Sequence, residues 1–223
     1  MLLQILTYTH HLTTMLFGIF LSAFFLGVKQ NKKNVCILLG GGAVSGLFFL
    51  ICNTVFGSLF TEAVYPIFVH LPLFLLLVFY YRFRWLPSII SIMTAYLCCQ
   101  FSNWAGIFAL SLSGLDWVYY LVRIIVTVAV FAFLSRYLCQ TTALLFAKSD
   151  RELYILGAMP FVYYVFDYST TKFSMLLYSG NKVVVEFLAF AMCISYVIFL
   201  FVYFQEYELK NRAEQYGQLT NMQ

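Results

Sequence analysis

Long apolar runs separated by short polar clusters organise this sequence. The runs from Leu71 to Tyr81 and from Val183 to Phe204 contain almost no charged residue, and a helix needs roughly 20 apolar residues to cross a bilayer. A membrane barrel would instead show ~10-residue segments in which apolar and polar residues alternate. The pattern therefore predicts an all-α membrane protein with seven transmembrane helices. We place these helices at residues 10–28, 35–58, 65–82, 86–109, 118–140, 152–169 and 182–204.

The composition supports lipid as the solvent of this chain. Of its 223 residues, 63% are hydrophobic and only 10% are charged, whereas a soluble domain has about 25% charged residues. A soluble core of this size has no room for so many apolar side chains. The net charge of +4 comes from short clusters between the apolar runs, so we expect a lipid bilayer and not a nucleic acid as the partner of this surface.

The positions of the lysines and arginines predict the orientation. With the N-terminus outside and the C-terminus in the cytoplasm, ten of the thirteen basic residues lie at the cytoplasmic face, as the positive-inside rule requires. A six-span alternative, in which residues 152–169 do not cross, moves the N-terminus inside and spoils this bias around Lys29. The ten residues are Lys29, Lys32, Lys33, Arg82, Arg84, Arg136, Lys148, Arg151, Lys210 and Arg212.

The composition changes abruptly after Phe204, which divides the chain into a multi-span sensor domain (residues 1–204) and a polar linker (residues 205–223). The linker consists mostly of strong helix formers. A helix that continues straight out of the membrane would align four apolar residues on one face and could begin a dimerisation stalk. A solvated C-terminal tail is the alternative. The four residues of this relay face are Leu209, Tyr216, Leu219 and Met222.

Ionisable residues within the predicted spans are the candidate ligand-binding residues. They are costly in a bilayer and commonly mark functional sites. We expect Arg123, Asp167, Lys172 and Glu186 to lie toward the outer ends of the last three spans, and His70 within the third span. The opposite charges could meet in a network that faces a ligand from outside. Alternatively they fix the packing of the helices or extend to the headgroups, and His70 bonds a neighbouring carbonyl or hydroxyl.

No motif of catalysis or cofactor binding is present. The sequence lacks H-E-x-x-H and G-x-S-x-G, and the Gly40–Gly42 run lacks the Lys-Ser or Lys-Thr of a phosphate loop. Gly42 and Gly46 instead predict close packing of the second span. The six cysteines lie in apolar surroundings without C-x-x-C spacing, which is typical of small buried hydrophobes. We therefore expect no catalytic residue, no cofactor and no metal in this chain.

A family resemblance rests on the last third of the sequence. D-Y-S-T-T begins at Asp167, L-Y-S-G ends at Gly180, V-V-E-F-L contains Glu186, and E-Y-E begins at Glu206. These segments resemble the end of the membrane sensor region in GHKL-domain histidine kinases of Gram-positive, Clostridia-type bacteria. In that family a helical linker leads to dimerisation helices and an ATP-binding domain. The residues after Glu214 contain neither the phosphoacceptor histidine nor the nucleotide-binding motifs.

The resemblance implies the signal-sensing module of a two-component histidine kinase in a bacterial plasma membrane. It implies reception of an extracellular or membrane signal, with a peptide or small molecule as ligand, and transmission through the last helix of a homodimer. This chain would have no enzymatic activity of its own, although the parent protein resembles a protein kinase. The alternative function is a small-molecule transport or substrate-capture subunit, which would need a site near the bilayer midplane.

Overall fold

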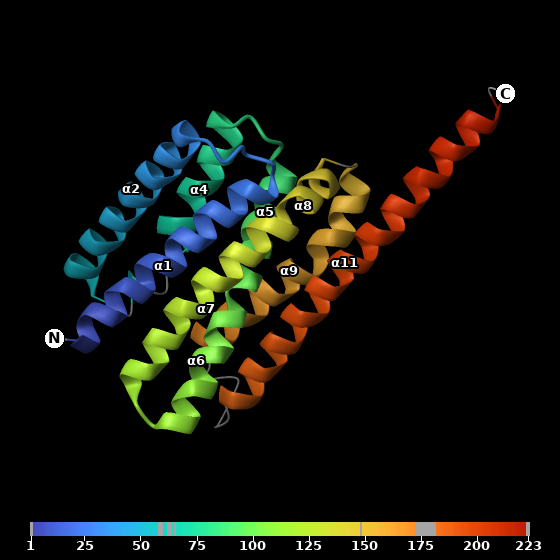
Figure 1. Ribbon diagram of the computed structural model, residues 1–223. Coiled ribbons are helices and arrows are strands. Elements are labelled where there is room, and N and C mark those ends of the chain that lie inside the picture. The colour runs from blue at the N-terminus through green and yellow to red at the C-terminus, as the bar shows by residue number, and fades with distance from the viewer. Residues whose placement is uncertain are drawn as a thin grey trace.

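Figure 1 shows the computed structural model, which describes residues 2–57, 60–61, 64, 66–147, 149–172 and 182–221. At positions 66, 151, 168–172, 182–189, 211 and 216–221 it describes the backbone alone. The regular elements of this part of the chain are all helical. They are α1 (Leu2–Phe25), α2 (Lys32–Phe56), the π-helix η1 (Pro66–His70), α4 (Leu71–Leu75), the π-helix η2 (Leu76–Tyr80), α5 (Trp85–Cys98), α6 (Gln100–Ser113), α7 (Asp116–Tyr137), α8 (Cys139–Phe146), α9 (Asp150–Lys172) and α11 (Lys182–Asn221).

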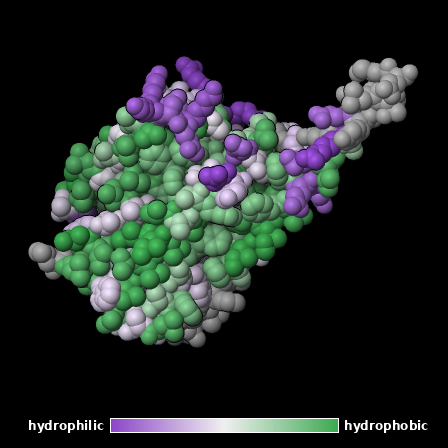
Figure 2. Space-filling view, in the orientation of Figure 1, coloured by the Kyte–Doolittle hydropathy of each residue, from purple (hydrophilic) through white to green (hydrophobic). Residues whose placement is uncertain are grey.

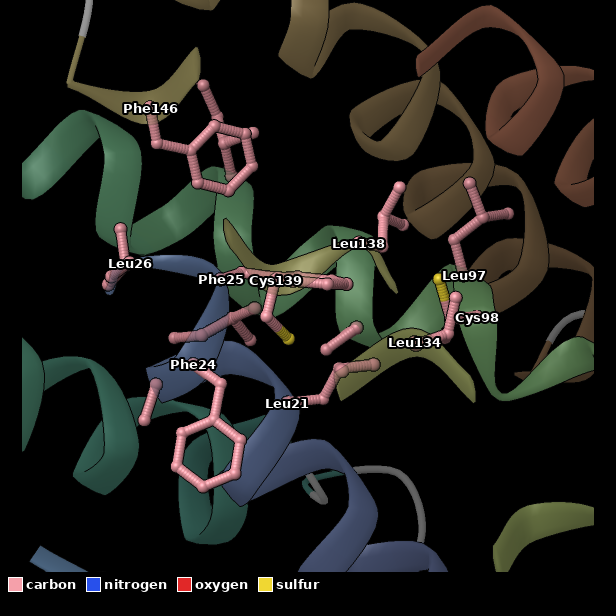
Figure 3. Close-up of a cluster of buried hydrophobic side chains, with 14 of the residues drawn as sticks. Leu21, Phe24, Phe25, Leu26, Leu97, Cys98, Leu134, Leu138, Cys139 and Phe146 are labelled. Carbon is pink, nitrogen blue, oxygen red and sulfur yellow. The ribbon is translucent and has the colours of Figure 1, made fainter. Parts of the chain in front are cut away.

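Helix α1 is the central element of the bundle. It packs against α2, α5, α7 and α8, and the side chains of its second half are buried. Figure 3 shows Leu21, Phe24 and Phe25 of α1 near the junction of α7 and α8 at Leu138 and the end of α5 at Cys98. Because lipid tails are as apolar as these side chains, close van der Waals packing holds this core together.

Small residues bring α2 close to α1. A Cβ at Gly42 would lie 3.1 Å from Ile19 Cδ1, and a Cβ at Gly46 would lie 3.5 Å from Met15 Cε. The prediction that this glycine face packs closely against another helix is therefore confirmed. Helix α2 begins at the cap residue Asn31, whose side chain accepts a hydrogen bond from the Asn34 N–H.

Four helical stretches are long and apolar enough to cross a membrane: Lys32–Phe56, Trp85–Ser113, Asp116–Tyr137 and Phe190–Gln215. In the described part of the chain, α1 and α9 are not among these stretches, and Ile67–Tyr80 is a shorter apolar helix. Many large apolar side chains are exposed, and the surface in Figure 2 is mostly hydrophobic. These are the properties of an all-α membrane protein. The number of seven spans and their orientation stay predictions.

The observed helices differ from the predicted spans most clearly at three places. Helix α1 begins at Leu2 rather than at residue 10, and its first turn is largely apolar, with Leu2, Leu3 and Ile5. The predicted span 86–109 is two helices with a turn at Cys99. The stretch 141–147, which lies between two predicted spans, is mostly part of α8.

The last helix is unusual in length and position. Helix α11 has 40 residues, which corresponds to roughly 60 Å at 1.5 Å per residue, about twice the hydrocarbon thickness of a bilayer. It runs without interruption from the apolar segment into the polar linker. Its C-terminal part extends beyond the other helices (Figure 1). Hydrophilic residues gather on this part and at the end of the bundle where α2 begins (Figure 2).

The close approach of α5 and α9 gives a first prediction. Gly157→Val should lower the free energy of unfolding by about 1–3 kcal/mol, as overpacked cores do, because a Cβ at Gly157 would lie 2.6 Å from Ile90 Cγ1. Nothing lies within 4 Å of a Cβ at Gly40, so Gly40→Val is the matched control. Thermal unfolding in detergent measures both variants, and equal losses would contradict this account of the contact between α5 and α9.

Candidate functional site

A polar and aromatic cluster joins η1, α5 and α9. We define the His70–Asp167 cluster as His70, Tyr96, Tyr163, Tyr164 and Asp167. His70 Nδ1 and the Tyr164 hydroxyl form a hydrogen bond of 2.8 Å, in which the donor depends on the histidine tautomer. The Tyr96 hydroxyl donates to Asp167 Oδ2 at 2.5 Å. Two hydrogen bonds therefore connect side chains of three helical elements in the interior of the bundle.

The rings of this cluster interlock. His70 meets the Tyr96 ring edge-on at a centroid distance of 5.7 Å, and Tyr96 meets Tyr164 edge-on at 5.1 Å. Edge-to-face geometry suits the charge distribution of aromatic rings and adds to the stability of such pairs. The fully buried Tyr163 lies beside Tyr96, with a centroid distance of 6.1 Å. A movement of one of these side chains therefore has to displace its neighbours.

Local backbone features position these residues. His70 ends a π-helical turn, a rare geometry that often occurs at functional sites. Tyr163, Tyr164 and Asp167 lie within five residues of α9, at a spacing that puts the first and last on one face of the helix. Gly157 allows α9 to approach Ile90 on α5, and this approach lets Tyr96 reach Asp167.

Arg123 belongs to a second cluster, between α1, α6 and α7. Its Nη1 donates to the Tyr119 hydroxyl at 2.5 Å, and its guanidinium carbon lies 5.1 Å from the centre of the Tyr119 ring. Its aliphatic stem lies against Gly106, where a Cβ would collide with it. The buried His10 contacts the Tyr120 ring at a centroid distance of 5.9 Å, which connects α1 to α7.

Two buried polar atoms on α7 make this second cluster unfavourable in free energy. Arg123 Nε and the Thr127 hydroxyl have no hydrogen-bond partner among the described residues. A buried donor without a partner costs about 1–3 kcal/mol. The arginine cluster is therefore a place where the observed packing is under strain.

The structure thus brings two of the predicted site residues together and separates a third. His70 and Asp167 share one cluster, whereas the contacts of Arg123 are with α6 and its own helix. The side chains of Lys172 and Glu186 lie outside the described residues. On the relay face, the Leu209 side chain is 67% exposed, the Tyr216 and Leu219 side chains are not described, and Met222 lies outside the described residues.

Sequence reasoning missed the tyrosines that hold both clusters. Tyr96, Tyr119, Tyr120, Tyr163 and Tyr164 were not among the candidate residues. A signal for the α9 residues was available, because a tyrosine pair three and four residues before an aspartate shares a helical face with it. No comparable signal connects Tyr96 with Asp167, which is 71 residues away.

The chemistry of the His70–Asp167 cluster is exchange of protons and hydrogen-bond partners. Asp167 carries a carboxylate that accepts from Tyr96, and protonation or a competing donor would weaken that acceptance. Within the described ranges, no three His, Cys, Asp or Glu side chains are close enough to hold a metal ion. The six cysteines are free thiols.

No family model matches the chain, and neither does a curated protein or a solved structure. The fold defines the class: a protein whose described residues form an all-helical bundle, with four helical stretches suited to crossing a membrane. Any more specific assignment depends on the two clusters and on α11.

The tyrosine that holds Asp167 gives the second prediction. Tyr96→Phe should lower the free energy of unfolding by about 1–2 kcal/mol, since a partly buried carboxylate loses its hydrogen-bond donor. The exposed Tyr154 lies on the same helix as Asp167, so Tyr154→Phe is the control and should change little. Thermal unfolding in detergent measures both losses. If they are the same, the bond between Tyr96 and Asp167 does not stabilise the bundle.

Proposed function

We propose that this chain is the transmembrane signal-sensing module of a two-component histidine kinase and passes a signal through α11 to a downstream kinase domain. The observation that carries this proposal is the shape of α11. One helix both packs into the bundle and leaves it as a polar helix (Figure 1). A rigid element of this kind can transmit a movement within the bilayer to a domain outside it.

The packing of α11 supports this role. Cys193, Tyr196 and Leu200 are fully buried, and the helix contacts α6, α8 and α9. A displacement of α9 therefore changes the surface against which α11 packs. Beyond Phe204 the helix carries exposed charged residues, including the pair Glu208 and Arg212 at 3.9 Å, as expected for a segment in water.

The distribution of hydrophilic residues supports a cytoplasmic C-terminus. The basic residues Lys29, Lys32 and Lys33 lie next to the start of α2, and hydrophilic residues are concentrated there (Figure 2). The proposed orientation has this end in the cytoplasm of a bacterium, in accordance with the positive-inside rule. The N-terminus is then outside, and all seven predicted segments span the plasma membrane.

The proposed ligand is an extracellular peptide or small molecule that acts on the His70–Asp167 cluster. Asp167 and His70 can exchange hydrogen-bond partners with a ligand, and exchange at either one changes the contacts between η1, α5 and α9. Lys172 and Glu186 would contribute from the ends of their helices, and Arg123 would act through the separate cluster on α7. A ligand that interacts differently with two arrangements of the bundle shifts their populations.

Two further parts of the proposal rest on the resemblance to GHKL-domain kinases. One is homodimerisation through α11, in which the exposed Leu209 side chain faces a second copy. The other is a kinase domain that follows the linker. A dimer is the arrangement in which a movement of two parallel helices can reposition the domains attached to them.

Transport is the second candidate function, and the interrupted helices favour it. The π-helical segments η1 and η2, the turn at Cys99 and Pro160 within α9 are the types of break that line transporter sites. Uptake of radiolabelled small molecules into proteoliposomes that contain the chain would support transport. The extended polar part of α11 has no evident use in that function.

Crosslinking in native membranes provides the third prediction and tests the sensor proposal. In a Cys36→Ser background, which removes the exposed native thiol, Leu209→Cys should form a disulfide-linked dimer under mild oxidation. Leu112→Cys is the control, because Leu112 is also exposed but lies on α6 at the end of the bundle far from the C-terminal extension. Adding Asp167→Asn should change the yield from Leu209→Cys.

Two outcomes would contradict the sensor proposal. One is the same crosslinking at Leu209→Cys and Leu112→Cys, which indicates random collision. The other is a yield from Leu209→Cys that Asp167→Asn leaves unchanged.

The gene sequence beyond the codon of Gln223 tests the kinase part. We expect an open frame that encodes a histidine-bearing helix, an Asn box and a glycine-rich ATP-binding motif. A stop codon directly after Gln223 would overturn the proposed downstream kinase and favour transport.

A further inference from the structure

A proline interrupts the hydrogen bonding of α9 at its centre. Pro160 lies inside this helix and has no N–H, so the Leu156 carbonyl cannot receive the helical bond that residue 160 would normally donate. A carbonyl without a partner is costly in an apolar interior. The Tyr196 hydroxyl on α11 donates to this carbonyl at 3.0 Å. The last helix thus supplies the hydrogen bond that the proline removes.

The contact is fully enclosed by the bundle. Leu156 and Tyr196 have no exposed surface, so water does not compete for the carbonyl. The Tyr196 oxygen also lies 3.4 Å from the hydroxyl of the buried Thr94 on α5. Because the tyrosine proton is used on the Leu156 carbonyl, Thr94 is the donor in this second contact.

A second donor on the same face of α11 binds the end of α5. Cys193 Sγ lies 3.1 Å from the Leu97 carbonyl and donates to it. Leu97 is in the last turn of α5, where carbonyl groups begin to lose their helical partners. Cys193 and Tyr196 are three residues apart and therefore neighbours on one helical face. Both donors of α11 thus bind where a neighbouring helix is interrupted.

The position of Pro160 relates this contact to the His70–Asp167 cluster. The residues after Pro160 carry Tyr163, Tyr164 and Asp167, whereas the turn before it carries the Leu156 carbonyl. Prolines are the usual cause of helix kinks, and bending is easiest at a turn whose hydrogen bond is already absent. A change in how η1 and α5 hold the cluster would therefore alter the bend of α9 at Pro160.

We propose that Pro160, the Leu156 carbonyl and the Tyr196 hydroxyl form a joint that couples the bend of α9 to the position of α11. In one arrangement the bend presents the carbonyl to Tyr196 and α11 is held against α9. In the other the carbonyl turns away, the hydroxyl loses its acceptor and α11 is released to move. The role of the joint in signalling rests on the proposed function. The energetic coupling between α9 and α11 does not depend on that function.

A double-mutant cycle on the intact chain tests the joint. Tyr196→Phe should lower the midpoint of thermal unfolding by roughly 2–4 °C, the shift expected for loss of about one hydrogen bond in a chain of this size. Pro160→Ala restores the N–H that can bind the Leu156 carbonyl. In the Pro160→Ala background, the loss from Tyr196→Phe should therefore fall to less than half.

Thr94→Val is the matched control, because it removes a hydroxyl next to Tyr196 without touching the Leu156 carbonyl. Its effect should be the same with either residue at position 160. An equal loss from Tyr196→Phe in both backgrounds would overturn the joint. The proposed function would survive that result if Asp167→Asn still changed the crosslinking of Leu209→Cys. The cycle could instead show coupling between Tyr196→Phe and Pro160→Ala while Asp167→Asn leaves the crosslinking yield unchanged. The joint would then be a real energetic coupling without a role in signalling.

Discussion

The constraint that shapes this protein is the absence of water as a hydrogen-bond partner for the backbone. In an apolar interior each peptide group has to be satisfied within the protein, which accounts for a described chain whose regular elements are all helical. Where a helix is interrupted, side chains supply the missing bonds. Tyr196 binds the carbonyl left by Pro160, and Cys193 binds a carbonyl at the end of α5.

Because of this constraint, a helix that is interrupted forms hydrogen bonds with a neighbouring helix. A continuous helix satisfies its own backbone and presents only van der Waals contacts to its neighbours. An interrupted helix needs a donor from elsewhere, so its geometry becomes linked to that of the helix that provides the donor. The interruptions of α5 and α9 both involve α11 in this way, and α11 is the helix that extends beyond the bundle. The face of α11 that stabilises the bundle is therefore also the face whose contacts change when the bundle rearranges.

Both polar clusters contain buried polar atoms that have no hydrogen-bond partner among the described residues. In the His70–Asp167 cluster, hydrogen bonds and edge-on rings join three elements, but the buried Tyr163 hydroxyl has no hydrogen-bond partner among the described residues. In the arginine cluster, a guanidinium and a threonine hydroxyl on α7 have buried atoms without a partner in the described part of the chain. Buried groups of this kind favour more than one arrangement of the bundle, because a repacking of α7 could recover the energy of its buried donors.

The sequence predicted the helical membrane class because long apolar runs leave few other folds available. It also marked His70 and Asp167, since polar groups in such runs are rare. It could not show that Arg123 lies apart from Asp167, because depth along a span does not determine which helices are neighbours. The turn at Cys99 contains neither glycine nor proline, so no local signal predicted it. Pro160 is visible as a helix breaker, but its partner Tyr196 depends on which face of α11 meets α9.

The distance between α11 and α9 tests the central claim most directly. Spin labels at Leu209→Cys and at Tyr154→Cys, both exposed positions, report this distance by pulsed electron paramagnetic resonance in nanodiscs, with Cys36→Ser as background. The account predicts that Asp167→Asn shifts the distance distribution and that the shift is lost when Tyr196→Phe is added. Distributions that coincide with and without Asp167→Asn would contradict the claim that α11 responds to the His70–Asp167 cluster.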